Sequence, residues 1–280
     1  MIKIIFLTAF ALCAFAFNSI LCRMALRGGE ADAVGFTLVR LVAGAITLIT
    51  ISYFFGKGTK SQGRGNWISA FFLFAYAICF SLAYLALNAG TGALILFGSV
   101  QLTMIVFALS RGERPGVLEW LGLVFALGGL VYLVFPGLAS PPLYSSLLMA
   151  AAGVAWGVYT LRGKGSDPLA ATTGNFIWSV PLIVVVSIAF FSQLHLSNRG
   201  LVLAVLSGAV ASGIGYTIWY AALKYHTSTR AAVLQLSVPV IAATGGILFL
   251  SEVATTRLWI AGGMILGGIA LTIAGRSRVR

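Results

Sequence analysis

The stretch that decides the fold lies in the middle of the chain and recurs near its end. Residues 113–130 have the sequence ERPGVLEWLGLVFALGGL, and residues 252–269, an offset of 139 positions, have the sequence EVATTRLWIAGGMILGGI. The leading glutamates coincide without a gap, as do Trp120 and Trp259 and the paired glycines near the end of each stretch. A match at a fixed offset of about half the chain length indicates a duplicated unit.

The composition places this duplicated unit in a membrane. Apolar residues make up 60% of the chain, charged residues only 9%, and the mean hydropathy is +1.02. A soluble domain of this size needs far more charged residues to cover its surface. In lipid, helices satisfy their own backbone hydrogen bonds, whereas barrel strands would show alternating hydrophobicity. We therefore predict an all-α polytopic membrane protein.

Ten apolar segments, separated by charged or Gly- and Pro-rich breaks, predict ten transmembrane helices. Each segment has 19 to 24 residues, close to the ~20 that a spanning helix needs. The loops between them are short, so consecutive helices run antiparallel and leave no room for a soluble domain. The segments are 4–25, 33–55, 67–88, 92–110, 116–135, 144–162, 169–191, 200–223, 229–250 and 257–275.

The basic residues predict the orientation of the bundle. Of the 18 Lys and Arg residues, 13 lie on the side of the N-terminus, four lie on the opposite side, and Arg40 lies within the second segment. Cytoplasmic loops of membrane proteins carry the excess of Lys and Arg. We therefore expect both termini in the cytoplasm, in a bacterial inner membrane. Anionic inner-leaflet lipid accounts for the net charge of +12 without a nucleic-acid partner.

Five segments in each unit place the two copies in opposite orientations. We predict a first five-helix repeat at residues 1–138 and a second, inverted five-helix repeat at residues 139–280. Inverted repeats of this kind are typical of secondary transporters. Weaker matches extend the duplication, since Tyr84 matches Tyr220 at an offset of 136 and Phe15-Ala16 matches Trp156-Gly157.

Aromatic side chains in repeat-related segments are the first candidates for a binding site. Tyr76 and Phe80 lie four residues apart in the third segment, and Tyr216 in the eighth segment holds the position equivalent to Phe80. Residues four apart share one face of a helix. Interhelical packing or an interfacial aromatic belt is the alternative interpretation. Because these three lie deep in their segments, where a tyrosine tip needs a partner or a wet cavity, we predict a cavity between the repeats.

Amide and hydroxyl side chains within the segments form the second group of candidates. They are Asn18, Gln101, Gln235 and Ser237. In hydrocarbon such groups face partners or water, so they mark the interior of the bundle. Hydrogen bonds between helices are the alternative to ligand binding. Pro239 removes a backbone donor within the ninth segment and is expected to kink it, and transporters expose backbone groups to substrate at such breaks.

The ionisable residues restrict the mechanism. All six acids lie in loops or at segment ends, so the usual groups of a proton relay or a cation site are missing. This favours facilitated movement of a solute without net charge. Arg40 is the one ionisable residue within a segment, and we consider two roles for it: snorkelling or pairing with a helix end, or binding of a carboxylate or phosphate. The cysteines give no disulfide framework, and no metal-ligand spacing is present.

Several motifs resemble the drug/metabolite transporter superfamily, in particular its ten-span proteins with two EamA-type repeats. The motifs are RGERPGVLEWLG at 111–122, its copy SEVATTRLWIAGG at 251–263, VPV at 238–240 and LVR at 38–40. The chain departs from the family pattern at Gln101, which stands where a proline is expected in the first half. The resemblance implies alternating access and a central cavity surrounded by the first, third, fourth, sixth, eighth and ninth segments. It also implies that the fifth and tenth segments pack outside the cavity.

Within the superfamily, the chain is most similar to the aromatic amino-acid exporter branch (YddG-type), by its size, its short loops and its cavity without acids. We therefore predict an inner-membrane carrier, not an enzyme, that exports aromatic and other neutral amino acids and related metabolites. Its expected partners are neutral or zwitterionic amino acids and membrane lipid, with no cofactor, no metal and no nucleic acid; a monomer fits this expectation.

The two groups of candidates divide the site between them. Polar side chains would bind the ammonium and carboxylate groups, and aromatic side chains would line the side-chain pocket. The polar set is Asn18, Gln101, Gln235 and Ser237; the aromatic set is Tyr76, Phe80, Trp156, Tyr159 and Tyr216.

Two other functions stay open. A drug or nucleotide-sugar or phosphometabolite transporter of the same superfamily is one, although a phosphorylated solute needs cationic groups in the cavity and only Arg40 is available. A membrane-embedded enzyme is the other, but the sequence has no HExxH motif, acid pair or Cys/His constellation.

Overall fold

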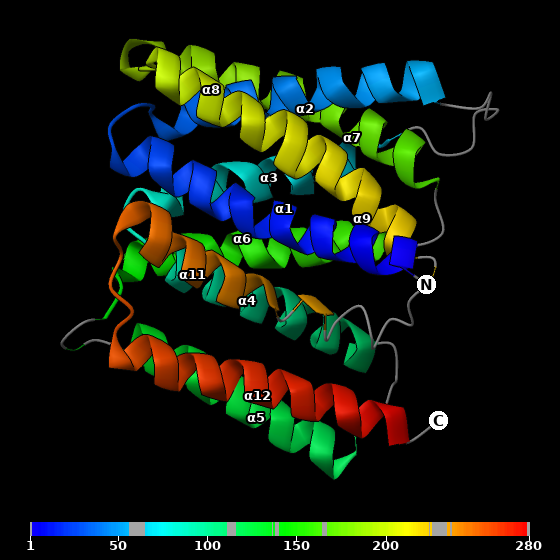
Figure 1. Cartoon of the computed structure of the whole chain (residues 1–280), viewed down its shortest axis with the longest axis vertical. Coiled ribbons are helices and arrows are strands. Elements are labelled where there is room, and N and C mark those ends of the chain that lie inside the picture. Colours follow the sequence, from blue (N-terminus) through cyan, green and yellow to red (C-terminus); the bar gives the residue numbers. More distant parts are fainter. Residues whose placement is uncertain are drawn as a thin grey trace.

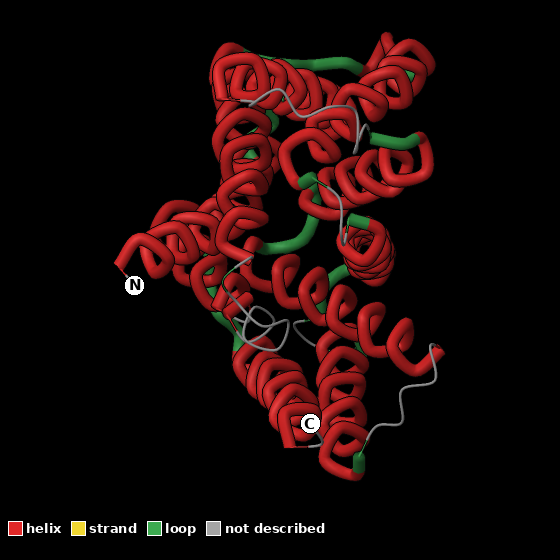
Figure 2. Tube along the Cα trace, turned by 90° about the vertical axis from the view of Figure 1, so that its right-hand side faces the viewer, coloured by secondary structure: helices red, strands yellow, loops and turns green. Residues whose placement is uncertain are grey.

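The predicted all-helical fold is confirmed by the computed structural model. It describes residues 2–55, 65–110, 116–135, 137, 140–163, 167–223, 225, 234–235 and 237–278. Within these residues the protein is helical and has no strand (Figure 2). A single isolated bridge, between Ala31 and Leu196, joins the loop after the first helix to the loop before α8.

Nine helical spans of the described chain are long and apolar enough to cross a bilayer, and one further apolar helix is shorter. The helices of the first half are α1 (Ile2–Arg27), α2 (Ala33–Phe55), α3 (Trp67–Tyr84), α4 (Ala89–Ser110) and α5 (Val117–Val134). Those of the second half are α6 (Leu143–Arg162), α7 (Pro168–Ala189), η1 (Phe191–Gln193), α8 (Asn198–Leu206), η2 (Ser207–Ile214), α9 (Gly215–Leu223), the shorter α11 (Ser237–Leu250) and α12 (Thr256–Arg278). The α8, η2 and α9 elements follow one another without a break and form one span.

The helices lie side by side, and both chain ends are at the same end of the bundle (Figure 1). We call this the termini end; the loops after α1, α3 and α11 lie at the opposite end (Figure 1). The helices α5 and α12 pack on each other along the lower edge of Figure 1 and reach the rest of the bundle through α4. They therefore lie outside the central helices, as the resemblance implied.

The packing partners of the two halves correspond. α1 packs against α11, and its repeat equivalent α6 packs against α4, which is the equivalent of α11. Likewise, α2 packs against η2, and its equivalent α7 packs against α3, which is the equivalent of the span that contains η2. α2 also packs on α7, α4 on α11 and α5 on α12, so that each of these helices contacts its own equivalent. A two-fold relation between five-helix units produces this pattern. It supports our proposal of inverted repeats at residues 1–138 and 139–280.

The turn between α3 and α4 differs from the sequence-based expectation, because α3 ends at Tyr84 and α4 already begins at Ala89. The cause is the ion pair between Arg23 and Glu252, two residues that are far from this turn in the sequence. Arg23 Nη1 donates to the carbonyl oxygens of Tyr84 at 2.9 Å and Leu85 at 3.0 Å. The carboxylate of Glu252 accepts from the Ala89 amide at 2.8 Å. Side chains from elsewhere thus satisfy both helix ends, whose backbone groups lack partners within the helix.

The predicted eighth span, 200–223, is a helix but not a regular one. η2 is a π-helix inserted between α8 and α9, a feature that often marks functional sites. Gly208 in η2 packs directly on the backbone carbonyl of Arg40, where any Cβ would overlap it. The backbone of the π-helix therefore packs directly against the backbone of α2. Ser207 and Ser212 are both fully buried there.

The repeated glycine motif holds α5 against α12. A Cβ on Gly122 would overlap the carbonyl oxygen of Gly268, and a Cβ on Gly268 would lie against the carbonyl oxygen of Gly122. Small residues that let two backbones approach are the usual means of association in lipid, where apolar burial gives no driving force. The stretch that revealed the duplication is therefore a packing element.

We expect Gly122→Ala to destabilise the protein by about 1–3 kcal/mol, because the added methyl group forces the two backbones apart. Thermal unfolding of the purified protein in detergent, followed by tryptophan fluorescence, measures this effect. Gly263→Ala on α12 is the matched control, since a Cβ there meets nothing within 4 Å. Equal unfolding temperatures for the two variants would contradict the packing role of Gly122.

Candidate functional site

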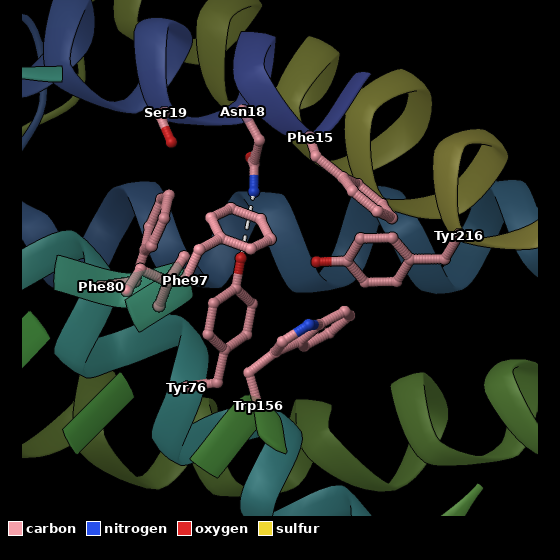
Figure 3. A pocket seen from close by; sticks show the side chains of 9 residues that line it. Phe15, Asn18, Ser19, Tyr76, Phe80, Phe97, Trp156 and Tyr216 are labelled. Atoms are coloured by element: carbon pink, nitrogen blue, oxygen red, sulfur yellow. Dashed lines mark hydrogen bonds between the residues drawn. The ribbon is translucent and has the colours of Figure 1, made fainter. Parts of the chain in front are cut away.

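A buried pocket lies at the centre of the bundle, where helices of both halves meet (Figure 3). Its lining comes from α1, α3 and α4 of the first half and from α6 and α9 of the second. The lining residues are Phe15, Asn18, Ser19, Tyr76, Phe80, Leu96, Phe97, Trp156 and Tyr216. Each of these residues is buried.

Helical spacing explains which residues face the pocket. On α1, Phe15, Asn18 and Ser19 are three and four residues apart and share one face. On α3, Tyr76 and Phe80 do the same. The opposite face of α1 includes Phe17, which is 45% exposed and directed away from the core. The sequence period thus separates a pocket-facing stripe from a lipid-facing one.

Five aromatic rings form a continuous cluster around the pocket, and a sixth ring, that of Phe97, also lines it. The Trp156 ring is its centre, with ring centroids 4.9 Å from Tyr76 and 4.8 Å from Tyr216. Phe15 contacts Tyr216 at 5.7 Å in an edge-on arrangement, and Phe80 lies 5.4 Å from Tyr76. Such spacings are those of favourable aromatic pairs. Phe97 completes the lining (Figure 3).

Arg40 of α2 lies directly behind this aromatic wall. Its side chain is only 1% exposed, so the snorkelling interpretation is wrong. The Nη2 group donates to the hydroxyl groups of Tyr76 at 3.1 Å and Tyr216 at 3.4 Å. The Nε group donates to Ser212 Oγ at 3.3 Å. The guanidinium also lies over the Phe80 ring, 4.9 Å from its centroid, in cation–π contact.

A second polar chain approaches the same point from α1. Asn18 Nδ2 donates to the Tyr76 hydroxyl at 3.3 Å, the bond drawn in Figure 3. Asn18 Oδ1 accepts from Ser207 Oγ of the π-helix. The Tyr76 hydroxyl therefore accepts from both Asn18 and Arg40. The Asn18 amide and the hydroxyls of Tyr76 and Tyr216 point toward the middle of the pocket, with Phe80 on the left and Phe15 and Trp156 on the right (Figure 3).

The pocket is small in this conformation. The space open to the centres of water molecules is about 10 Å³, which is room for about one water molecule. A solute the size of an amino acid enters only if the surrounding helices move apart. The structure thus shows the cavity in a contracted state that is too small for such a solute.

Helix ends are tied together at the end opposite the termini. Arg23 Nε lies 3.2 Å from Glu252 Oε1, and the two side chains are only 8% and 5% exposed. Through the helix-end contacts already described, this pair links α1, the turn between α3 and α4, and the loop after α11. Arg27 Nη1 adds a bond to the Leu250 carbonyl oxygen at 2.6 Å.

Most of the site residues expected from the sequence come together in the structure. Asn18, Tyr76, Phe80, Trp156 and Tyr216 line the pocket. Tyr159 lies just beyond it, with its ring 5.4 Å from that of Trp156 and its hydroxyl accepting from Asn175 at 3.5 Å.

Besides Tyr159, four expected residues are not part of the pocket lining. Gln101 is buried at 5% exposure on α4, one turn beyond Phe97 toward the termini end. Gln235 is partly buried, and Ser237 Oγ donates to the Leu234 carbonyl oxygen at 2.7 Å. Pro239 is a buried residue near the described start of α11. Leu236 lies outside the described residues, so the proposed kink stays a prediction.

Sequence reasoning missed part of the site. Phe15, Ser19, Leu96 and Phe97 also line the pocket. Phe15 could have been found, since the repeat offset pairs it with Trp156. Leu96 and Phe97 carry no such signal, because α4 is apolar on nearly every side and its period does not show which face is inward.

An all-helical membrane bundle with a buried pocket where its halves meet has the architecture of a secondary transporter. Comparison with known proteins agrees. The EamA-like transporter family model matches residues 143–274. A solved crystal structure shares the fold, with a TM-score of 0.69, 19% identity and coverage of 96% of both chains.

Relatives extend over nearly the whole chain. An uncharacterized protein of Pseudomonas aeruginosa is 48% identical over 98% of this chain and 96% of its own length. A "probable amino-acid metabolite efflux pump" of Salmonella typhimurium is 26% identical over 71% of this chain and 70% of that protein. An "uncharacterized transporter" of Archaeoglobus fulgidus is 24% identical over 83% and 86% of the two chains. The second half of the chain thus matches the EamA-like transporter family, and relatives that cover most of the chain are named as transporters.

We expect Arg23→Gln to destabilise the protein by about 3–5 kcal/mol, because it leaves the buried Glu252 carboxylate without its counter-ion. The double variant Arg23→Gln/Glu252→Gln is expected to recover part of this loss, since it removes the unpaired charge. A double-mutant cycle on thermal unfolding in detergent measures the coupling. Additive effects of the two substitutions would show that the pair contributes no coupling.

Proposed function

We propose that this transporter is a bacterial inner-membrane carrier that exports aromatic and other neutral amino acids and related metabolites. The observation that carries the proposal is the chemistry of the central pocket. Its wall is formed by six aromatic rings and Leu96, and the Asn18 amide and the hydroxyls of Tyr76 and Tyr216 point toward its middle. Aromatic walls favour aromatic or branched apolar side chains. Hydroxyl and amide groups that converge in this way suit the polar end of an amino acid.

The relatives support this assignment. Proteins named as amino-acid metabolite efflux pumps in Salmonella typhimurium and Escherichia coli are 26% and 25% identical to this chain. We assign the protein to the aromatic amino-acid exporter branch of the superfamily on the basis of its aromatic pocket and short loops. The sequence-based orientation places the termini end in the cytoplasm, so the Arg23–Glu252 pair is at the outer end.

Transport in this proposal proceeds by alternating access. The Arg23–Glu252 pair fixes α1 against the turn between α3 and α4, and in this proposal it acts as the outer gate. Release to the outside requires this pair to separate and the aromatic walls to move apart. A bound solute shifts the equilibrium only as far as it binds the open state better than the closed one. The solute's contacts with the pocket must therefore offset the loss of the ion pair.

No coupling ion is part of the proposal. The pocket lining includes no carboxylate in the part of the chain that is described, and each described acid is at a span end or in a loop. Proton relays and cation sites in membranes are built on buried acids. The solute gradient then drives the flux.

A phosphorylated metabolite is the second candidate solute, and Arg40 is the observation that favours it. Phosphate groups are held by several cations or by bidentate arginine contacts. In the described structure one guanidinium, that of Arg40, contacts the residues that line the pocket, and it balances a single negative charge. A sugar phosphate also finds few partners among the aromatic rings, so the amino-acid assignment fits the pocket better.

Uptake of labelled phenylalanine by proteoliposomes tests the proposal. We expect saturable flux without a pH gradient, and a KM about tenfold higher in Trp156→Ala because an aromatic contact and its buried area are lost. Trp120→Ala is the matched control, since that ring is 48% exposed on α5. Lack of saturable flux for every amino acid tried would overturn the function, and flux only under a proton gradient would overturn the uncoupled mechanism.

A further inference from the structure

The most unusual group in the central site is the guanidinium of Arg40, which is buried and has no carboxylate partner among the described acids. All five described acids are occupied elsewhere. Arg23 pairs with Glu252 and Arg199 with Glu30. Backbone amides at helix starts bind the carboxylates of Asp32, Glu119 and Asp167. In the described chain, the only groups that accept hydrogen bonds from Arg40 are the neutral hydroxyls of Tyr76, Ser212 and Tyr216.

One nitrogen of this guanidinium has no acceptor. Nη1 is buried and has no hydrogen-bond partner among the described residues, whereas Nη2 divides its donation between two tyrosine hydroxyls. The parallel Nη1 and Nη2 groups of arginine match the two oxygens of a carboxylate. A buried cation whose donors are only partly satisfied is best stabilised by an anion.

The two tyrosines connect this guanidinium to the pocket through its Nη2 group. Tyr76 and Tyr216 line the pocket and also contact Arg40, and in Figure 3 the Tyr216 hydroxyl points toward the pocket centre. A hydroxyl that accepts from a guanidinium keeps its own proton to donate. If the pocket widens, both hydroxyls and the guanidinium can donate to the same anion.

We propose that Arg40 anchors the carboxylate of the transported solute, with Tyr76 and Tyr216 as additional donors. The inference rests on the proposed function and names the solute class of that same cavity: monocarboxylates with an aromatic or branched apolar body. The amine is not the recognised group, because the lining offers it no carboxylate and Asn18 Oδ1 already accepts from Ser207. Carboxylates without an amine are therefore solutes as well.

Competition with labelled phenylalanine in proteoliposomes tests this on the unaltered protein. We expect 3-phenylpropionate, which keeps the carboxylate and lacks the amine, to inhibit within a few-fold of unlabelled phenylalanine. Phenethylamine and phenylalaninamide, which lack the carboxylate, should be weaker by roughly tenfold or more, since charge-assisted hydrogen bonds are lost. Equal inhibition by phenethylamine and 3-phenylpropionate would overturn the inference while leaving amino-acid transport standing.

Variants locate the carboxylate contact. Arg40→Gln should lose the preference for 3-phenylpropionate over phenethylamine, and Arg40→Lys should keep part of it because the charge remains. Arg257→Gln is the matched control. It also removes a guanidinium over a tyrosine ring, 5.4 Å from Tyr132, but Arg257 is on α12 outside the pocket. A purely structural role for Arg40 predicts equal losses for all solutes, and that result would overturn the inference.

A direct binding measurement distinguishes failure of this inference from failure of the proposed function. Thermal unfolding of the detergent-solubilised protein is measured with 3-phenylpropionate and with phenethylamine. We expect stabilisation by the carboxylate alone, and none in Arg40→Gln. If phenylalanine flux is absent but this stabilisation is found, the carboxylate site stands and the amino-acid function fails. If phenylalanine flux is present but the two compounds stabilise equally, the function stands and the carboxylate site fails.

Discussion

The structure of the central site depends on one buried charge. The Arg40 guanidinium of α2 lies in an apolar bundle, where an arginine at the bilayer centre costs at least ~2.5–3.5 kcal/mol. Tyr76 on α3, Ser212 in η2 and Tyr216 on α9 offset part of that cost, and the Phe80 ring adds a cation–π contact. The same bonds join helices of both halves around the pocket. A solute that binds there changes the partners of groups that hold the halves together.

The backbone of the π-helix η2 packs closely against α2 at Arg40. Gly208 lets the π-helix pass directly over the carbonyl of Arg40, and the π-helix brings Ser207 to Asn18 and Ser212 to Arg40. A regular helix advances by 100° per residue and would rotate one of the two serines away. The irregular span is therefore the means by which α1 and α2 share one polar network with the second half.

The sequence predicted the fold well because its signals are local or repeated. Apolar length identified the helices, and the glycine motif at 113–130 and 252–269 indicated the duplication. Helical spacing and the repeat offset placed Tyr76, Phe80 and Tyr216 on a common cavity. Leu96 and Phe97 could not be predicted, since an evenly apolar helix shows no inner face. The start of α4 depends on Glu252, 163 residues away in the sequence, and such a distant cap leaves no local pattern.

The role of Arg40 could also be recognised only in the three-dimensional structure. Its distance from the end of α2 suggested that it could reach the membrane surface, and only the tyrosine and serine contacts show that it turns inward. The most direct measurement of its function is the charge moved during transport, recorded from proteoliposomes on a solid-supported membrane. We expect a jump in 3-phenylpropionate to move negative charge into the liposomes and a jump in phenylalanine to move none. Absence of current with 3-phenylpropionate, or a current that arises only with a proton gradient, would contradict an uncoupled carboxylate carrier.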